Sequence, residues 1–225
     1  VLNAGEIENY GVELSLFGSP IKTTDFNWNV NVNWTKNENT VLSLAEGIEN
    51  LQLGSFQGGV TINARVGQAY GVIQGTDFTY SDNGEKIVDA TSGEYIKTST
   101  SDNVIGDTNP DWLMGISNTF SYKNLSISFL IDIQQGGSIF SLDQYYGQAT
   151  GLYAETAFIN DLGNPVRNSL ADGGGFINPG VNPDGTANTT RIRADRFGAF
   201  GYRRGLPNAA FVYDASYVKL RELAI

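Results

Sequence analysis

Apolar and polar residues alternate strictly along residues 26–34. Every second position is apolar or aromatic, and every position between is asparagine. The apolar positions are Phe26, Trp28, Val30, Val32 and Trp34. Successive side chains of a β-strand point to opposite faces, so this period of two predicts a strand with one apolar and one polar face. Trp28 and Trp34 would lie about 20 Å apart along it, at about 3.4 Å per residue.

Residues 10–16, 114–122 and 125–134 repeat the alternation. Asn118 interrupts the apolar face of the second segment, and Leu130 interrupts the polar face of the third. A fifth strand is expected from about Val212 to the end of the sequence. Its faces cannot be assigned, because Tyr217 and Lys219 break the pattern. The third segment adds Ile127, Phe129 and Ile131 to the apolar positions.

The connections between these strands differ greatly in length. Residues 18–25 form a polar turn with Pro20, and Lys123-Asn124 predicts a tight hairpin. Residues 35–111 and 134–211 are long connections rich in turn-forming residues. Short strands are expected near residues 69–73 and 86–89, and a short helix near 151–160. Compact soluble domains seldom contain two unstructured connections of such length.

Alternating short turns and long loops are typical of outer-membrane barrels, with brief periplasmic turns and extended extracellular loops. The spacing of Trp28 and Trp34 suits two aromatic girdles around an apolar band about 25 Å tall. The pattern therefore favours an all-β fold, an antiparallel transmembrane β-barrel segment of about five strands. The alternative is a secreted, soluble β-sandwich that binds glycans or mediates adhesion, since its strands also alternate.

Composition narrows the possible functions. The chain has 225 residues, is 17% charged and 12% aromatic, and contains neither cysteine nor histidine. Disulfides, thiolate metal sites and histidine-based nucleophile systems are therefore excluded within it. A formal net charge of −10 argues against nucleic acid. No apolar run has the length of a transmembrane helix, and no signal peptide precedes the first strand.

Several residue clusters invite a chemical interpretation. Asp102, Asp107, Asp111 and Asp143 could supply a glycosidase carboxylate pair, but solvated loop carboxylates explain them more simply. Residues 82–85 and 182–185 resemble calcium loops only faintly, and turns explain them better. Residues 173–175 are glycines without the lysine of a phosphate-binding loop. We expect no enzyme activity, metal or cofactor.

Aromatic and arginine side chains gather in the second long connection. Aromatic rings stack on sugars or peptide side chains, and arginine binds carboxylates and hydroxyls. These residues are candidates for contact with a ligand or partner, although packing of the loop is the simpler expectation. The candidates are Tyr145, Tyr146, Tyr153, Arg196, Phe197, Phe200, Tyr202 and Arg203.

Seven short motifs run along nearly the whole chain. They are NYGVEL at 9–14, FNW at 26–28, VGQAYGVIQG at 66–75, IGDTNPDW at 105–112, NTFSYKN at 118–124, QGG at 135–137 and SYVKLREL at 216–223. This ordered set resembles the later part of the barrel in the SusC/RagA type of TonB-dependent outer-membrane transporter.

The resemblance implies a function and a setting. Such transporters have about 22 strands around a plug, so residues 1–225 would be a partial barrel domain lacking the plug, the early strands and the terminal strands. The whole protein would import oligosaccharides or peptides across the outer membrane of a Gram-negative, Bacteroidetes-like cell. Its partners would be a SusD-like surface lipoprotein and TonB, the latter through the plug. The apolar positions named above would face lipid.

Overall fold

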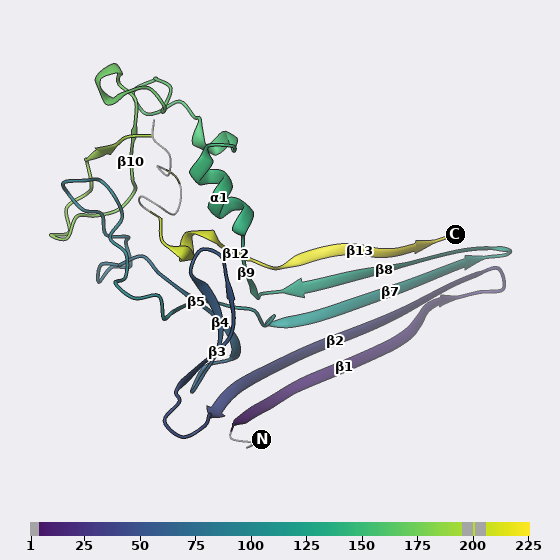
Figure 1. The fold of residues 1–225 in the computed structure, drawn as a ribbon. Helices are drawn as coiled ribbons and strands as arrows, with labels where there is room; N and C mark the ends of the chain where they lie inside the picture. The colour runs from purple at the N-terminus through teal and green to yellow at the C-terminus, as the bar shows by residue number, and fades with distance from the viewer. Residues whose placement is uncertain (1–4, 195–199, 201–205) are drawn as a thin grey trace.

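A computed structural model describes residues 5–194, 200 and 206–225. Its main feature is an antiparallel five-stranded sheet with the order β1-β2-β7-β8-β13. The strands reach away from the rest of the molecule as one layer (Figure 1). They are β1 (Glu6–Lys22), β2 (Phe26–Ser43), β7 (Trp112–Tyr122), β8 (Leu125–Gln135) and β13 (Tyr217–Ala224). The four strands predicted from the alternation at residues 10–16, 26–34, 114–122 and 125–134 are all present, and short turns join β1 to β2 and β7 to β8 at one end of the sheet.

Several strand boundaries differ from the prediction: β1 begins at Glu6, and β2 continues past Trp34 to Ser43, into the predicted long connection. β1 continues through Pro20 to Lys22, so the turn before β2 covers only residues 23–25. The register with β2 shifts between Gly18 and Ile21, where proline can be accommodated without a ladder hydrogen bond. The expected fifth strand is in fact two, because Ala215 and Ser216 separate β12 (Val212–Asp214) from β13. β12 pairs with β9 (Ser138–Phe140) rather than with the large sheet.

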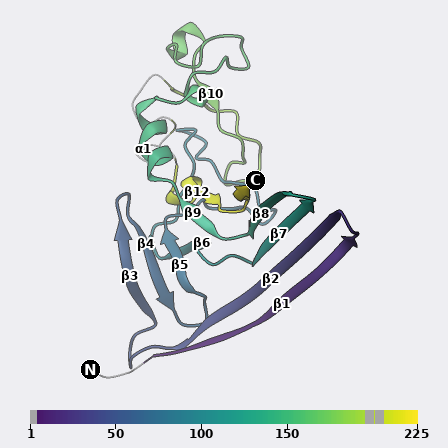
Figure 2. The same ribbon diagram turned by 90° about the vertical axis from the view of Figure 1, so that its right-hand side faces the viewer.

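The first long connection contains a second antiparallel sheet, ordered β3-β4-β5-β6. Figure 2 shows it at the end of the long strands opposite the short turns. Its strands are β3 (Asn50–Phe56), β4 (Val60–Arg65), β5 (Tyr70–Gly75) and β6 (Asn103–Asp107). β5 confirms the strand predicted near 69–73. Residues 86–89 form isolated bridges instead of a strand, with Val88 opposite Tyr95.

The second long connection carries the helix α1 (Leu142–Thr150). Its remaining elements are short: η1 (Ala154–Thr156), η2 (Leu170–Asp172), β10 (Phe176–Ile177), β11 (Arg191–Ile192) and η3 (Asn208–Phe211). The helix was predicted at residues 151–160, which is too far toward the C-terminus, because α1 ends at Thr150. Ser141 caps α1 by accepting a 3.2 Å hydrogen bond from Gln144 N, and Gly151 ends it at φ +74°. No helix in the described ranges is both long and apolar enough to cross a membrane.

The two long connections pack together into one body. Val88 N donates to Val181 O at 2.8 Å, and Val181 N donates to Lys86 O at 3.0 Å. Asn178 Nδ2 donates to Gly93 O at 2.7 Å. Among the described residues, the fully buried hydrophobic side chains all lie in this body except Val41, at the loop end of β2. The hydrophobic core is therefore in the connections, and the long strands have none of their own.

Asn208 holds three segments of this body together. Its Oδ1 accepts from Thr76 N at 2.9 Å and from Thr76 Oγ1 at 2.8 Å, and its Nδ2 donates to Gly58 O at 2.7 Å. The side chain is 6% exposed. One amide thus joins the tip of the β3–β4 hairpin, the end of β5 and η3, across more than a hundred residues of sequence.

Replacing Asn208 with alanine should loosen both connections. The change leaves Gly58 O and Thr76 without their buried hydrogen-bond partner. The free energy of local unfolding of the connections should fall by about 2 kcal/mol, so the locally unfolded population should rise roughly 30-fold. Trypsin cleavage after Lys86 should accelerate accordingly. Asn83→Ala, in the exposed turn at residues 81–84, is the matched control and should leave cleavage unchanged. Equal cleavage rates for both variants would contradict the role assigned to Asn208.

Candidate functional site

The hydrogen-bond register places the predicted apolar positions on one face of the large sheet. Trp28 pairs with Phe120, and Phe120 pairs with Ile127. Val32, Ile116, Ile131 and Leu220 form a second such row, across four strands. All eight residues expected to face lipid lie on this face and are half-buried, namely Phe26, Trp28, Val30, Val32, Trp34, Ile127, Phe129 and Ile131. Their contact with lipid remains a prediction.

An aromatic row crosses the apolar face near the short turns. Phe120 lies between Trp28 and Phe129, with ring centroids 5.5 and 6.0 Å away and both pairs stacked. Asn118, which interrupts the apolar pattern, belongs to this row. It is 8% exposed, and its Oδ1 accepts a 3.0 Å hydrogen bond from Trp28 Nε1. The single amide therefore satisfies an indole N–H that an apolar surface would leave without a partner.

The opposite face is polar throughout most of its width. It carries the asparagines of β2 and the serines and threonine of β7 and β8. Ser15 Oγ donates to Asn33 Oδ1 at 2.8 Å, and Ser19 Oγ donates to Asn29 Oδ1 at 2.6 Å. These lateral bonds tie β1 to β2 and leave further amide donors and acceptors facing outward.

Charged residues join this polar face on β8 and β13. Asp132 accepts from Tyr217 Oη at 3.1 Å and forms an ion pair with Arg221 Nε at 3.2 Å. Lys219 Nζ lies 3.6 Å from the centre of the Tyr217 ring. A register shift between Leu220 and Glu222 makes Arg221 a β-bulge. The bulge explains why the faces of this strand could not be assigned from the sequence, because a period of two fails across it.

The junction between the long strands and the connections is built from the quoted motifs. We call residues 107–112, 134–138 and 214–217 the rim. Asp111 N donates to Gln135 O at 2.8 Å, and Gly136 N donates to Ser216 Oγ at 2.7 Å. Asp214 Oδ1 accepts from Ser216 N at 2.7 Å. The hydrogen bonds that Asp214 accepts from Ser216 Oγ and Ser216 N hold the pKa of its carboxyl below the usual range.

A second set of bonds joins the rim to the four-stranded sheet. Asn39 Oδ1 accepts from Tyr70 N at 2.6 Å, and Asn109 Nδ2 donates to Tyr70 O at 2.9 Å. Thr108 Oγ1 donates to Gly71 O at 2.9 Å. Alternation along the chain predicts no role for these side chains, although the motifs at 66–75 and 105–112 include both segments. Their role is to fix the loop sheet at the end of the strands.

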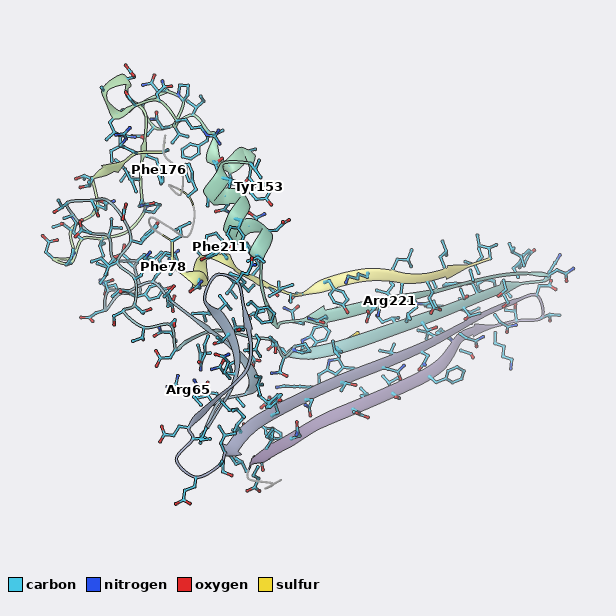
Figure 3. All side chains as sticks on the ribbon, viewed as in Figure 1. Arg65, Phe78, Tyr153, Phe176, Phe211 and Arg221 are labelled. Carbon is cyan, nitrogen blue, oxygen red and sulfur yellow. The ribbon has the colours of Figure 1, made fainter. Side chains whose placement is uncertain are left out.

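Of the eight ligand candidates, Tyr145, Tyr146, Tyr153 and Phe200 lie within the described residues, where Tyr145 and Phe200 pack in separate aromatic groups. Tyr145 is 6% exposed, donates to Gly58 O at 3.3 Å, and packs on Phe211 with ring centroids 5.1 Å apart. Tyr146 is adjacent and exposed. Burial and Asp143 raise the pKa of Tyr153. Figure 3 shows Tyr153, Phe176 and Phe211 in the body formed by the connections, and Arg221 on the large sheet.

Phe200 belongs to a separate aromatic group. Its ring stacks on Phe176 with centroids 4.8 Å apart and meets Phe158 at 6.1 Å. The other candidates, Arg196, Phe197, Tyr202 and Arg203, lie outside the described residues. Ligand contact remains a prediction for the whole set, while packing is the role that the structure displays for Tyr145 and Phe200.

The acidic candidates offer no metal centre. In the described part of the chain, no group of three or more acidic side chains could hold a metal ion. Asp107 and Asp111 line an open, polar pocket of about 510 Å³ beside the rim. Asp184 Oδ1 accepts from Thr186 N at 3.0 Å and Thr186 Oγ1 at 2.6 Å, as in a turn, and these bonds lower the pKa of its carboxyl.

Comparison with known proteins identifies relatives. No family model matches the chain. TonB-dependent receptor P3 of Formosa agariphila is 26% identical over 245 residues, covering 100% of this chain and 22% of the receptor. TonB-dependent receptor SusC of Bacteroides thetaiotaomicron is 27% identical over 189 residues, covering 78% of this chain and 19% of the receptor. The predicted resemblance to SusC-type TonB-dependent receptors is confirmed.

Solved structures support the fold. The structure of the RagAB peptide transporter superposes with a TM-score of 0.59 and 17% sequence identity, covering 98% of this chain and 23% of that one. The chain spans about a fifth of the length of the curated relatives it matches. These relatives are named as receptors and a transporter rather than enzymes, in agreement with the prediction that the chain is not an enzyme.

The rim depends on a glycine that can adopt a left-handed conformation. Gly136 has φ +76°, and a Cβ atom there would lie 2.5 Å from Asp111 Cγ. Gly136→Ala should therefore destabilise the protein by about 2 kcal/mol or more and lower its unfolding midpoint. Circular dichroism of the purified protein measures this midpoint. Gly54→Ala is the control, since a Cβ at Gly54 meets no atom within 4 Å. Equal unfolding midpoints for the Gly136→Ala and Gly54→Ala variants would show that the rim does not require a glycine at position 136.

Acid should weaken the rim through Asp214. Because its folded pKa lies below the ordinary value of 3.8, ionised Asp214 stabilises the rim above that value, and the contribution is lost as the pH falls through the folded pKa. Hydrogen exchange at Gly136 and Ser216, corrected for intrinsic rates, should therefore accelerate below about pH 4. Asp214→Asn should remove this dependence. An unchanged acid response in that variant would contradict the assignment.

Proposed function

We propose that this chain forms part of the wall and mouth of an outer-membrane barrel in a TonB-dependent importer. β1, β2, β7, β8 and β13 form the wall, and residues 1–225 are a partial barrel domain. The observation that carries the proposal is the continuous apolar face that the register builds opposite a polar face. Lipid would cover the apolar face, and a water-filled or plug-filled lumen would hydrogen-bond with the polar face.

The sheet lacks the packing that a soluble sandwich would require. A sandwich buries the apolar face against a second sheet about 10 Å away. On this face Val12, Leu14 and Leu220 are 61%, 48% and 61% exposed, and Figure 1 shows no described element lying over the long strands. The secreted glycan-binding sandwich therefore has less support than a wall whose apolar face meets lipid.

The strand lengths and turns suggest an orientation. β7 and β8 each have 11 residues, which matches the roughly 9 to 11 residues of a tilted transmembrane strand. β1 and β2 have 17 and 18 residues and extend past them on the side of the long connections. In the proposed orientation the short turns lie in the periplasm, and the body formed by the connections lies at the cell surface.

The remaining parts of the proposal concern the whole protein. We assign it the import of oligosaccharides or peptides across the outer membrane of a Gram-negative bacterium. A SusD-like surface lipoprotein would deliver substrate at the mouth, and TonB would act through a plug. The names of the relatives, which include a TonB-dependent SusC receptor and the RagAB peptide transporter, support this assignment.

Neighbouring residues on β2 provide a direct test of the wall. A nitroxide spin label at Val32→Cys should collide with oxygen dissolved in the bilayer, because Val32 lies on the apolar face. The matched label at Asn31→Cys, one residue away on the opposite face, should be shielded from bilayer oxygen. Electron paramagnetic resonance of the full receptor in lipid vesicles measures both accessibilities. Equal oxygen accessibility at the two positions would overturn the proposal.

A further inference from the structure

Asparagine followed by glycine occurs once in the chain, at Asn83 and Gly84. The pair lies in the turn of a short hairpin in the first long connection, and an isolated bridge closes the hairpin at its base. Inside the turn Gly84 N donates to Ser81 O at 2.9 Å, and Ser81 N donates to Glu85 O at 2.8 Å. Because these contacts all lie within residues 80–86, the turn is shaped by its own residues.

The side chain of Asn83 is not held in place. Within the described residues, no hydrogen bond or ion pair involves its amide group. The two Asp-Gly pairs of the chain differ in this respect. Ser169 Oγ donates to Asp172 Oδ2 at 2.7 Å, and Thr186 Oγ1 donates to Asp184 Oδ1 at 2.6 Å. Those carboxyl groups are tied to other side chains, whereas Cγ of Asn83 is free to approach the next peptide nitrogen.

Glycine at position 84 leaves that nitrogen unhindered. It has no side chain to shield the nitrogen, and an added Cβ there would meet no atom of the described structure within 4 Å. The hydrogen bond from Gly84 N to Ser81 O must open before the nitrogen can react. A single bond in a turn opens at low free energy, because opening exposes no hydrophobic core.

We propose that Asn83 is a site of deamidation, an intramolecular modification that needs only water. The nitrogen of Gly84 bonds to Cγ of Asn83, and its proton leaves with the side-chain nitrogen as ammonia. The two reacting groups belong to adjacent residues, which favours this step, and the product is a cyclic succinimide. Water then opens the ring. Breaking the bond from Gly84 N to Cγ gives aspartate, and breaking the bond from Gly84 N to the backbone carbonyl carbon gives isoaspartate.

The modification changes both the charge and the backbone of the turn. Either product adds one negative charge at neutral pH. Isoaspartate also inserts one carbon atom into the main chain, so the bond between Ser81 and Gly84 cannot keep its geometry. Lys86 O, in the same hairpin, accepts a 3.0 Å hydrogen bond from Val181 N. Isoaspartate at position 83 should therefore loosen the contact between the two long connections.

Peptide mapping of the purified full-length protein by mass spectrometry tests the site. Trypsin releases residues 66–86 as a peptide that contains a single asparagine. During incubation near neutral pH, Asn83 should deamidate at least about tenfold faster than Asn124, an exposed turn residue followed by leucine. The rate should rise with pH, because the attacking nitrogen must lose its proton. Equal rates at the two asparagines, or conversion of Asn83 only in denatured protein, would overturn the proposal.

The Gly84→Ala variant tests the role of the neighbouring residue. A methyl group beside the nitrogen should slow deamidation of Asn83 about tenfold or more. The wild-type rate of deamidation in this variant would overturn the proposal.

The Asn83→Gln variant is the matched control for the loosening. It keeps an amide at position 83 but would have to form a larger ring, so it should not age in the same way. Trypsin cleavage after Lys86, normalised to cleavage of the denatured protein, should rise with incubation time in the wild type and stay constant in the variant. Constant cleavage of the wild type while isoaspartate accumulates would contradict the loosening.

Discussion

The structure depends on the hydrogen-bond register of the large sheet. A slip by one residue between β2 and β7 would place Asn31 beside Ile116 and reverse the faces of every residue beyond it. The observed register aligns Val32, Ile116 and Ile131 instead, so an apolar surface continues across strands far apart in sequence. Asparagine alternates with an apolar residue along the whole of residues 26–34, so a slip by one residue exchanges the two faces over this entire stretch.

The distribution of buried residues follows from this requirement. A single sheet with one apolar and one polar face has no interior of its own, so the folding energy from hydrophobic burial within the chain must arise elsewhere. The connections supply it with Val60, Val72, Ile73 and Phe211. This explains why the connections are long and why they contain a sheet and a helix. They are the globular part of the chain, and the rim fastens the wall to them.

Much of the wall could be predicted from the sequence, because alternation is a local signal. The predictions of the short turns and of the apolar face were therefore correct. The local signal failed where geometry departs from a period of two, at the Arg221 bulge and at Pro20 within β1. The prediction also placed the helix after Gly151, whereas Gly151 ends it. The N-cap at Ser141 and the left-handed C-cap at Gly151 are weak signals in a segment that is rich in turn-forming residues.

The mouth could not be predicted in the same way, because its contacts join residues distant in sequence. Asn208 and Gly58 are 150 residues apart, and no periodicity records their hydrogen bond. Aromatic rings in these loops suggested ligand contact, yet Tyr145 and Phe200 pack against other rings. The reason lies in the large sheet, which has one apolar and one polar face. A chain whose long strands build no hydrophobic core of their own uses its loop aromatics as core, as the packing of Tyr145 on Phe211 and of Phe200 on Phe176 shows.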